Sequence, residues 1–156
     1  MRRSFTLAIE PFSLNAMYCR DIRYKSAKFR NWQPRFFMQM AQVLPQQAFK
    51  DLREAFDPLK NSYLVCLTYY YPEFFTKKDA QISAQTEDLS NCEKIIVDAL
   101  FLPKNHAIGV PYGCPNLNID DKHIVCLTSK KKPAKAGETK TTMRIDIAIV
   151  AKPVHP

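Results

Sequence analysis

Five polar side chains in the second half of the chain have the types and spacing of a metal-dependent phosphodiesterase site. Asp88, Ser90, Asn91 and Lys94 stand close together, and Asp121 follows after a loop. Carboxylates held at the ends of two different elements can share one Mg²⁺, a cation that prefers oxygen ligands. That cation can activate water and stabilise charge on a scissile phosphate, and a nearby ammonium can neutralise a phosphate oxygen or a leaving group. Such an arrangement would suit hydrolysis of a phosphodiester.

A plainer interpretation accounts for the same residues. Asp88 can be a helix cap, Lys94 a solvated surface residue, and Asp120 with Asp121 a pair in a turn. Spacing alone favours this plainer interpretation, because isolated acids at the ends of loops are common.

The elements that must position these residues are predicted from hydrophobic spacing. Alternation and aromatic content predict strands near residues 4–9, 62–71, 122–129 and 141–150, with another near 81–85. Helical spacing predicts one helix that has Pro34 in its first turn and a second that restarts after Pro45 and runs to Leu59.

A third helix is predicted immediately after the first acid. Asp88 or Ser90 can cap it, and Pro103 stops it. Its buried stripe is formed by Ile95, Ile96, Ala99 and Leu100. Asp88 then lies where a strand passes into a helix, and Asp121 lies where a loop enters a strand.

Length and order of elements predict one α+β domain over residues 1–156, with helices packed on a mixed sheet. Within it we expect a basic loop and helix over 15–60, an acidic site over 87–121 and a basic C-terminal hairpin over 122–151. The net charge of +8 divides accordingly: residues 1–60 carry eleven Lys/Arg against five Asp/Glu, residues 61–128 carry five against eight, and residues 129–156 carry seven against two. An acidic centre between basic flanks suits a protein that holds a polyanion at its edges and a cation in its middle.

Cysteine usage and hydropathy indicate the compartment. The five cysteines are scattered and form no CxxC pair, which favours a reduced intracellular protein. The chain has neither a signal-peptide pattern nor an apolar stretch long enough to span a membrane, so we expect a cytoplasmic protein without a membrane partner. His106, Cys114 and His123 are too irregularly spaced for a zinc site, and a structural or surface role is expected for them.

The run Asp88-Leu89-Ser90-Asn91-Cys92-Glu93-Lys94, followed by Asp98-Ala99-Leu100 and later by Asp120-Asp121, resembles the RusA-type Holliday junction resolvase family. Members of that family carry D-L-D-N-x-x-K, then D-A-L in a helix, then a D-D pair. The resemblance implies a C2 homodimer that makes paired, Mg²⁺-dependent nicks across four-way or branched DNA, with Mn²⁺ as a substitute cation. It also implies a role in DNA recombination or repair, and a protein of this kind would suit a phage.

The resemblance assigns roles to individual positions. Asp88, Lys94 and Asp121 correspond to the catalytic residues, and Asp88, Ser90 and Asp121 to the metal ligands, with Asp120 as the alternative to Asp121 if the loop register is displaced by one. Asn91 is expected to support the site and to contact DNA.

Ser90 departs from the family, which has a second Asp at this position. A hydroxyl can ligate Mg²⁺ but brings no negative charge. The alternative function is therefore a catalytically weakened or inactive DNA-binding protein of the same fold. A basic RNA-binding or ribosome-associated protein is a weaker alternative, which the acidic centre disfavours.

Two groups of cations are expected to bind DNA phosphates, although the second group, at the tip of the expected C-terminal hairpin, is equally compatible with a flexible, solvated turn. The first group is interleaved with Tyr24, Phe29 and Trp32, of which Phe29 and Trp32 are equally compatible with the core. The dimer surface is not marked, although Phe36–Leu44 and Tyr69–Tyr71 are candidates for it. The expected DNA-binding cations are Arg20, Arg23, Lys25, Lys28, Arg30 and Arg35 in the first group and Lys130, Lys131 and Lys132 in the second.

Overall fold

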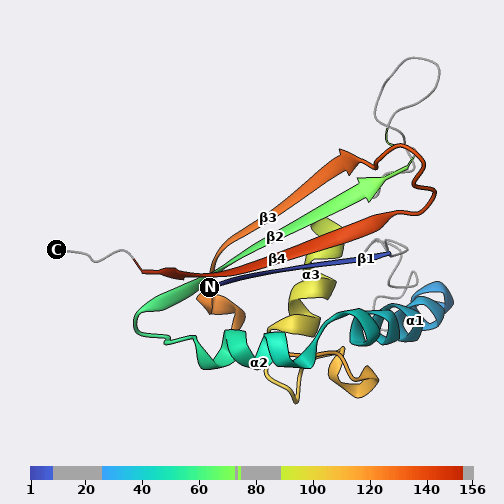
Figure 1. The fold of residues 1–156 in the computed structure, drawn as a ribbon. Coiled ribbons are helices and arrows are strands. Elements are labelled where there is room, and N and C mark those ends of the chain that lie inside the picture. The colour runs from blue at the N-terminus through green and yellow to red at the C-terminus, as the bar shows by residue number, and fades with distance from the viewer. Residues whose placement is uncertain (9–25, 73, 75–88, 153–156) are drawn as a thin grey trace.

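A mixed four-stranded sheet with three helices on one of its faces forms the centre of the computed structural model (Figure 1). The structure describes residues 1–8, 26–72, 74 and 89–152, with the backbone alone for residues 89–92. The predicted class, a single α+β fold with helices packed on a mixed sheet, is confirmed. In chain order the elements are β1 (Arg2–Ala8), α1 (Ala27–Val43), α2 (Gln46–Glu54), β2 (Asn61–Tyr71), α3 (Leu89–Leu100), the 3₁₀ turns η2 (Val110–Tyr112) and η3 (Asp121–His123), β3 (Ile124–Pro133) and β4 (Thr142–Ala151).

The strands lie in the order β1-β4-β2-β3. β4 pairs antiparallel with both β1 and β2, whereas β2 and β3 are parallel. Parallel neighbours need a crossover connection, and α3 occupies the connection between β2 and β3. The predicted C-terminal hairpin is therefore wrong: β2 lies between β3 and β4, and Lys130–Lys132 belong to strand β3 rather than to a hairpin tip.

The core lies between the sheet and the helices. Alternate residues of each central strand point to the helices, as the period of two requires, and the residues between them face the other side of the sheet. The Tyr63 hydroxyl, which is buried, donates to the Leu52 carbonyl at 3.1 Å and joins β2 to the end of α2. The buried strand residues include Phe5, Leu7, Val65, Leu67, Ile145 and Ile147.

Helix α1 begins seven residues earlier than the position of Pro34 suggested. Ser26 caps it, because its side chain accepts from the Phe29 amide at 3.1 Å. Pro34 lies inside the helix instead of in its first turn. Burial of the helix stripe outweighs the hydrogen bond that a proline removes. The stripe consists of Phe29, Trp32, Phe36, Phe37 and Met40, so Phe29 and Trp32 are core residues.

Pro45 separates α1 from α2, as predicted, but α2 ends at Glu54. The predicted extension to Leu59 is wrong, since Leu59 is 86% exposed in the turn before β2. Tyr69 and Tyr71, considered for the dimer surface, are buried in the core, whereas the other candidate, Phe36–Leu44, exposes Met38 and Val43. The predicted strand near 81–85 lies outside the described residues. None of the described helices is both long and apolar enough to cross a membrane.

Candidate acidic site and basic surfaces

Helix α3 carries the central part of the candidate site. Its apolar stripe is buried as predicted: Ile95 and Ile96 are each 3% exposed, and Ala99 and Leu100 are fully buried. This burial turns the opposite face of the helix to solvent. Lys94 lies on that face, with 68% of its side chain exposed, and its Nζ is 3.2 Å from Oδ2 of Asp98 one turn later. Asp98, of which 19% of the side chain is exposed, thus restrains the Lys94 ammonium on the helix surface.

Asp120 and Asp121 have different roles at the turn η3. Asp120 caps the turn, because its Oδ1 accepts from the Lys122 amide at 3.0 Å and its Oδ2 lies 3.1 Å from the Lys122 ammonium. These contacts, the amide first, hold the pKa of Asp120 below its ordinary value. Asp121 is the first residue of the turn and is exposed. Both acids thus belong to the turn, as the plainer interpretation predicts, and Asp120 is the one that caps it.

The two ends of α3 carry different parts of the candidate site. The Leu117 amide donates to the Leu100 carbonyl at 2.8 Å, and the Ile119 amide donates to the Phe101 carbonyl at 2.9 Å. Asp121 therefore follows a segment bound to the C-terminal end of the helix. Asp88 is joined by one peptide bond to Leu89, which begins the helix at its other end. Twelve helical residues span roughly 18 Å, so the helix length separates its first residue, Leu89, from Leu100, to which the segment before Asp121 is bound.

The remaining acidic-site positions are only partly described. Asp88 lies outside the described residues. Ser90 and Asn91 lie in the first turn of α3, so the helix begins before Ser90, and the structure does not describe their side chains. Within the described part of the chain, no three His, Cys, Asp or Glu side chains are grouped so that they could hold a metal ion.

The expected DNA-binding cations fall on two elements and one undescribed stretch. Lys28, Arg30 and Arg35 are exposed on α1. Lys130 and Lys132 are exposed on the edge strand β3, and Lys131 is half-buried there. Arg20, Arg23 and Lys25 lie outside the described residues.

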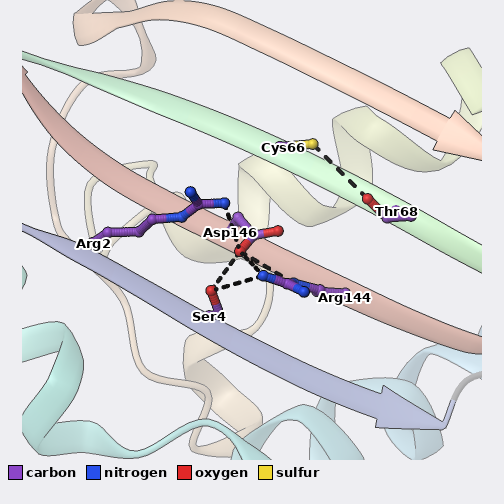
Figure 2. Close-up of polar contacts among 6 residues, drawn as sticks. All are labelled: Arg2, Ser4, Cys66, Thr68, Arg144 and Asp146. Carbon is purple, nitrogen blue, oxygen red and sulfur yellow. Dashed lines mark hydrogen bonds and ion pairs between the residues drawn. The ribbon is translucent and has the colours of Figure 1, made fainter.

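The face of the sheet that lacks helices carries a polar network that was not predicted (Figure 2). Asp146 is its centre, with 9% of its side chain exposed. Its Oδ1 accepts from Arg144 Nη2 at 2.9 Å and from Arg2 Nη2 at 3.3 Å, and it also accepts from the Ser4 hydroxyl. Burial raises the pKa of Asp146, but the hydrogen bonds from Ser4 and Arg144 outweigh it, so the net pKa lies below the ordinary value.

The sequence does contain a signal for this network. In the alternation Arg144-Ile145-Asp146-Ile147, the isoleucines mark the buried face of the strand. A carboxylate between them must face the other side, and two residues earlier an arginine faces the same way.

The histidines and Cys114 have the structural and surface roles expected of them. Cys114 is buried and its Sγ donates to the Phe37 carbonyl at 3.0 Å. Burial raises the pKa of this thiol to about 12. His123 packs edge-on against the Phe56 ring, with 5.4 Å between the ring centroids. His106 is exposed and contacts the neighbouring Asn105.

No model of a known protein family matches the chain, and a search of curated proteins finds no similar sequence. The likeness to RusA-type resolvases therefore consists of the quoted motif and its spacing.

Proposed function

We propose that the protein is a Mg²⁺-dependent endodeoxyribonuclease that cuts four-way or branched DNA. One observation carries the proposal: the motif residues Lys94 and Asp121 lie exposed on and beside a single well-packed helix, while the neighbouring stripe is buried. A catalytic lysine and a carboxylate must be both solvent-accessible and held by rigid structure. The basic surfaces on α1 and β3 supply the charge that binds phosphates.

The donor atoms suit the cation that the motif implies. Asp121 and Asp88 offer carboxylate oxygens, and Ser90 offers a hydroxyl, all of which are hard ligands of the type that Mg²⁺ takes. When bound, Mg²⁺ would activate water and stabilise charge on the scissile phosphate. Lys94 would neutralise charge on a phosphate oxygen, and its ion pair with Asp98 would limit the positions its ammonium samples.

The length of α3 bears on the proposed assembly. The helix is roughly 18 Å long, whereas two oxygen ligands of one Mg²⁺ lie only about 4 Å apart. We propose that Asp88 and Asp121 reach a shared cation from two copies of the chain. We propose a C2 homodimer, which also provides the paired sites that symmetric cutting of a junction needs.

The second candidate function is structure-specific DNA binding without cleavage. Ser90 favours it, because the site has one carboxylate fewer than the family pattern and should hold a divalent cation less tightly. The two functions differ in one measurable respect: the binding protein retains salt-sensitive affinity for a junction but does not nick it.

The test is nicking of a synthetic four-way junction, titrated with Mg²⁺ and Mn²⁺. For Asp88→Asn and Asp121→Asn we expect a loss of roughly 100-fold or more, since each removes a ligand charge. Asp120→Asn should retain most of the activity, because Asp120 caps a turn. Glu138→Gln, which changes an exposed acid in the connection between β3 and β4, is the matched control. Undiminished nicking in both the Asp88 and Asp121 variants would eliminate the proposed site, and loss in Asp120→Asn alone would move the ligand by one residue.

Ser90→Asp separates the two candidate functions in the same assay. A wild-type protein that binds without nicking, and gains nicking in Ser90→Asp, is a DNA-binding protein descended from an enzyme. A wild-type protein that nicks, with Ser90→Asp needing less Mg²⁺, is an enzyme with a weakened metal site.

A further inference from the structure

An open pocket of about 430 Å³ lies between α2 and the segment that follows α3. Helix α2 contributes Lys50 and Arg53 to it, and the segment after α3 contributes Lys104. The buried residues Phe49 and Cys114 also line the pocket and connect it to the core. The pocket therefore belongs to the packed structure, although cations form part of its lining.

The charges of this pocket are all of one sign. Its described lining contains three cations and the amides of Gln46 and Gln47, but no carboxylate. Lys50 lies 3.8 Å from Glu54, a long and exposed ion pair that contributes little. Three cations around one hollow repel each other unless an anion lies between them. The pocket is thus complementary to a small, highly charged anionic group such as a phosphate.

The pocket also lies at the Asp121 end of α3. The Lys104 amide donates to the Asn118 side chain at 3.0 Å, so Lys104 is tied to the segment that leads into Asp120 and Asp121. Gln46 donates from its side chain to the Gly113 carbonyl at 3.0 Å, which ties the start of α2 to the same segment. The Gln46 contact therefore joins α2 to the loop of residues 103–118, which leads into Asp120 and Asp121.

We infer that this pocket binds a backbone phosphate of the DNA strand that passes Asp121. Arg53 and Lys104 contact the phosphate oxygens. The segment of residues 103–118 builds one side of this subsite. The inference rests on the proposed function in one respect, that the ligand is DNA, but it does not require cleavage.

The test measures binding of a fluorescent four-way junction without Mg²⁺, at several salt concentrations. For the double variant Arg53→Gln/Lys104→Gln we expect roughly tenfold weaker binding at low salt. The slope of log affinity against log salt should decrease by about 0.9 for each phosphate that the variant no longer neutralises. The double variant Lys60→Gln/Lys152→Gln removes the same charge from exposed lysines outside the pocket, and should change the affinity by less than about threefold.

Equal weakening in the pocket variant and the control variant, or an unchanged salt slope in the pocket variant, would overturn the inference. Thermal unfolding of both variants checks that they are folded. If the pocket variant loses DNA affinity while wild type shows no nicking in Mg²⁺, the subsite stands and the nuclease function fails. If wild type nicks the junction and the pocket variant binds it normally, the nuclease function stands and the subsite fails.

Discussion

Asp146 shows how a single buried charge is accommodated on a sheet face. One carboxylate oxygen of Asp146 accepts from Arg144, Arg2 and Ser4. Both arginines remain accessible to solvent, because 42% of the Arg144 side chain and 65% of the Arg2 side chain are exposed. The ionised acid is thus fixed by donors from two neighbouring strands, β1 and β4. Because this pairing favours the charged form, its contribution to stability depends on pH.

Asp146→Asn should lower the free energy of unfolding by about 1–2 kcal/mol near pH 7, because charge-assisted hydrogen bonds are removed while the exposed arginines can be solvated again. The folded-state pKa of Asp146 is depressed, so its contribution is fully present above the unfolded-state pKa of about 3.9 and is lost as pH falls through the folded-state value. Urea unfolding of wild type and variant at pH 7 and near pH 3 checks this. Glu138→Gln, in the exposed connection between β3 and β4, is the control. A wild-type-to-variant difference that stays constant or grows on acidification would contradict the assignment.

At the scale of elements, α3 and the loop that follows it form one packed unit. Gly109 lies where a side chain has no room: a Cβ there would be 3.0 Å from the Cys114 Cβ and 3.2 Å from the Ala99 Cβ. Its φ of −87° is accessible to any residue, so close packing rather than backbone conformation requires glycine. This close approach presses the loop against the buried side of α3.

Gly109→Ala should therefore destabilise the fold by about 1–3 kcal/mol, the usual cost of overpacking. Chemical denaturation measures the loss. Gly137→Ala is an informative comparison: Gly137 has a φ of +88° and nothing within 4 Å of an added Cβ, so its cost of about 1 kcal/mol would come from the backbone alone. Exposure of the Cys114 thiol to a thiol reagent should increase in Gly109→Ala and stay unchanged in Gly137→Ala. Gly109→Ala with wild-type stability would show that the loop is free to move away.

At the scale of the whole molecule, α3 lies in the layer of helices on one face of the sheet, at a steep angle to the parallel pair β2 and β3 (Figure 1). Asp121 precedes β3 at the edge where that strand begins. Residue 89 starts the helix that follows β2. Lys94 thus lies in the middle of α3, whereas Asp121 follows a segment that is hydrogen-bonded to the C-terminal end of this helix.

Mixing two inactive variants tests whether the proposed site is shared between copies. Heterodimers of Asp88→Asn and Asp121→Asn, isolated with two affinity tags, should regain one intact site each. They should therefore nick a junction at roughly half the wild-type rate, but without paired cuts on both strands. Each variant homodimer is the control. Heterodimers as inactive as the homodimers, or a failure to form any dimer, would contradict a shared site.

The local pattern of apolar residues and prolines in the sequence was enough to predict most of the helices and strands. The stripe Ile95, Ile96, Ala99 and Leu100 is buried as its spacing indicates, and Pro45 separates two helices. The strands at β1, β2, β3 and β4 were located to within a few residues. These features depend on which side chains of a short segment are apolar, and a sequence states that directly.

The tertiary structure alone decided which segments meet. Strand β4 lies between β1 and β2, and Asp146 contacts Arg2, so both features join residues that are distant in sequence. The pocket likewise brings Arg53 together with Lys104. Pro34 lies inside α1 because the helix stripe is buried against such distant residues. The packing of the whole core determines which distant segments pair and which residues they bury. No short segment encodes that packing. The sequence motif identified Lys94 and Asp121 as candidate site residues. Only the fold shows that the segment before Asp121 is bound to the C-terminal end of α3, away from Leu89.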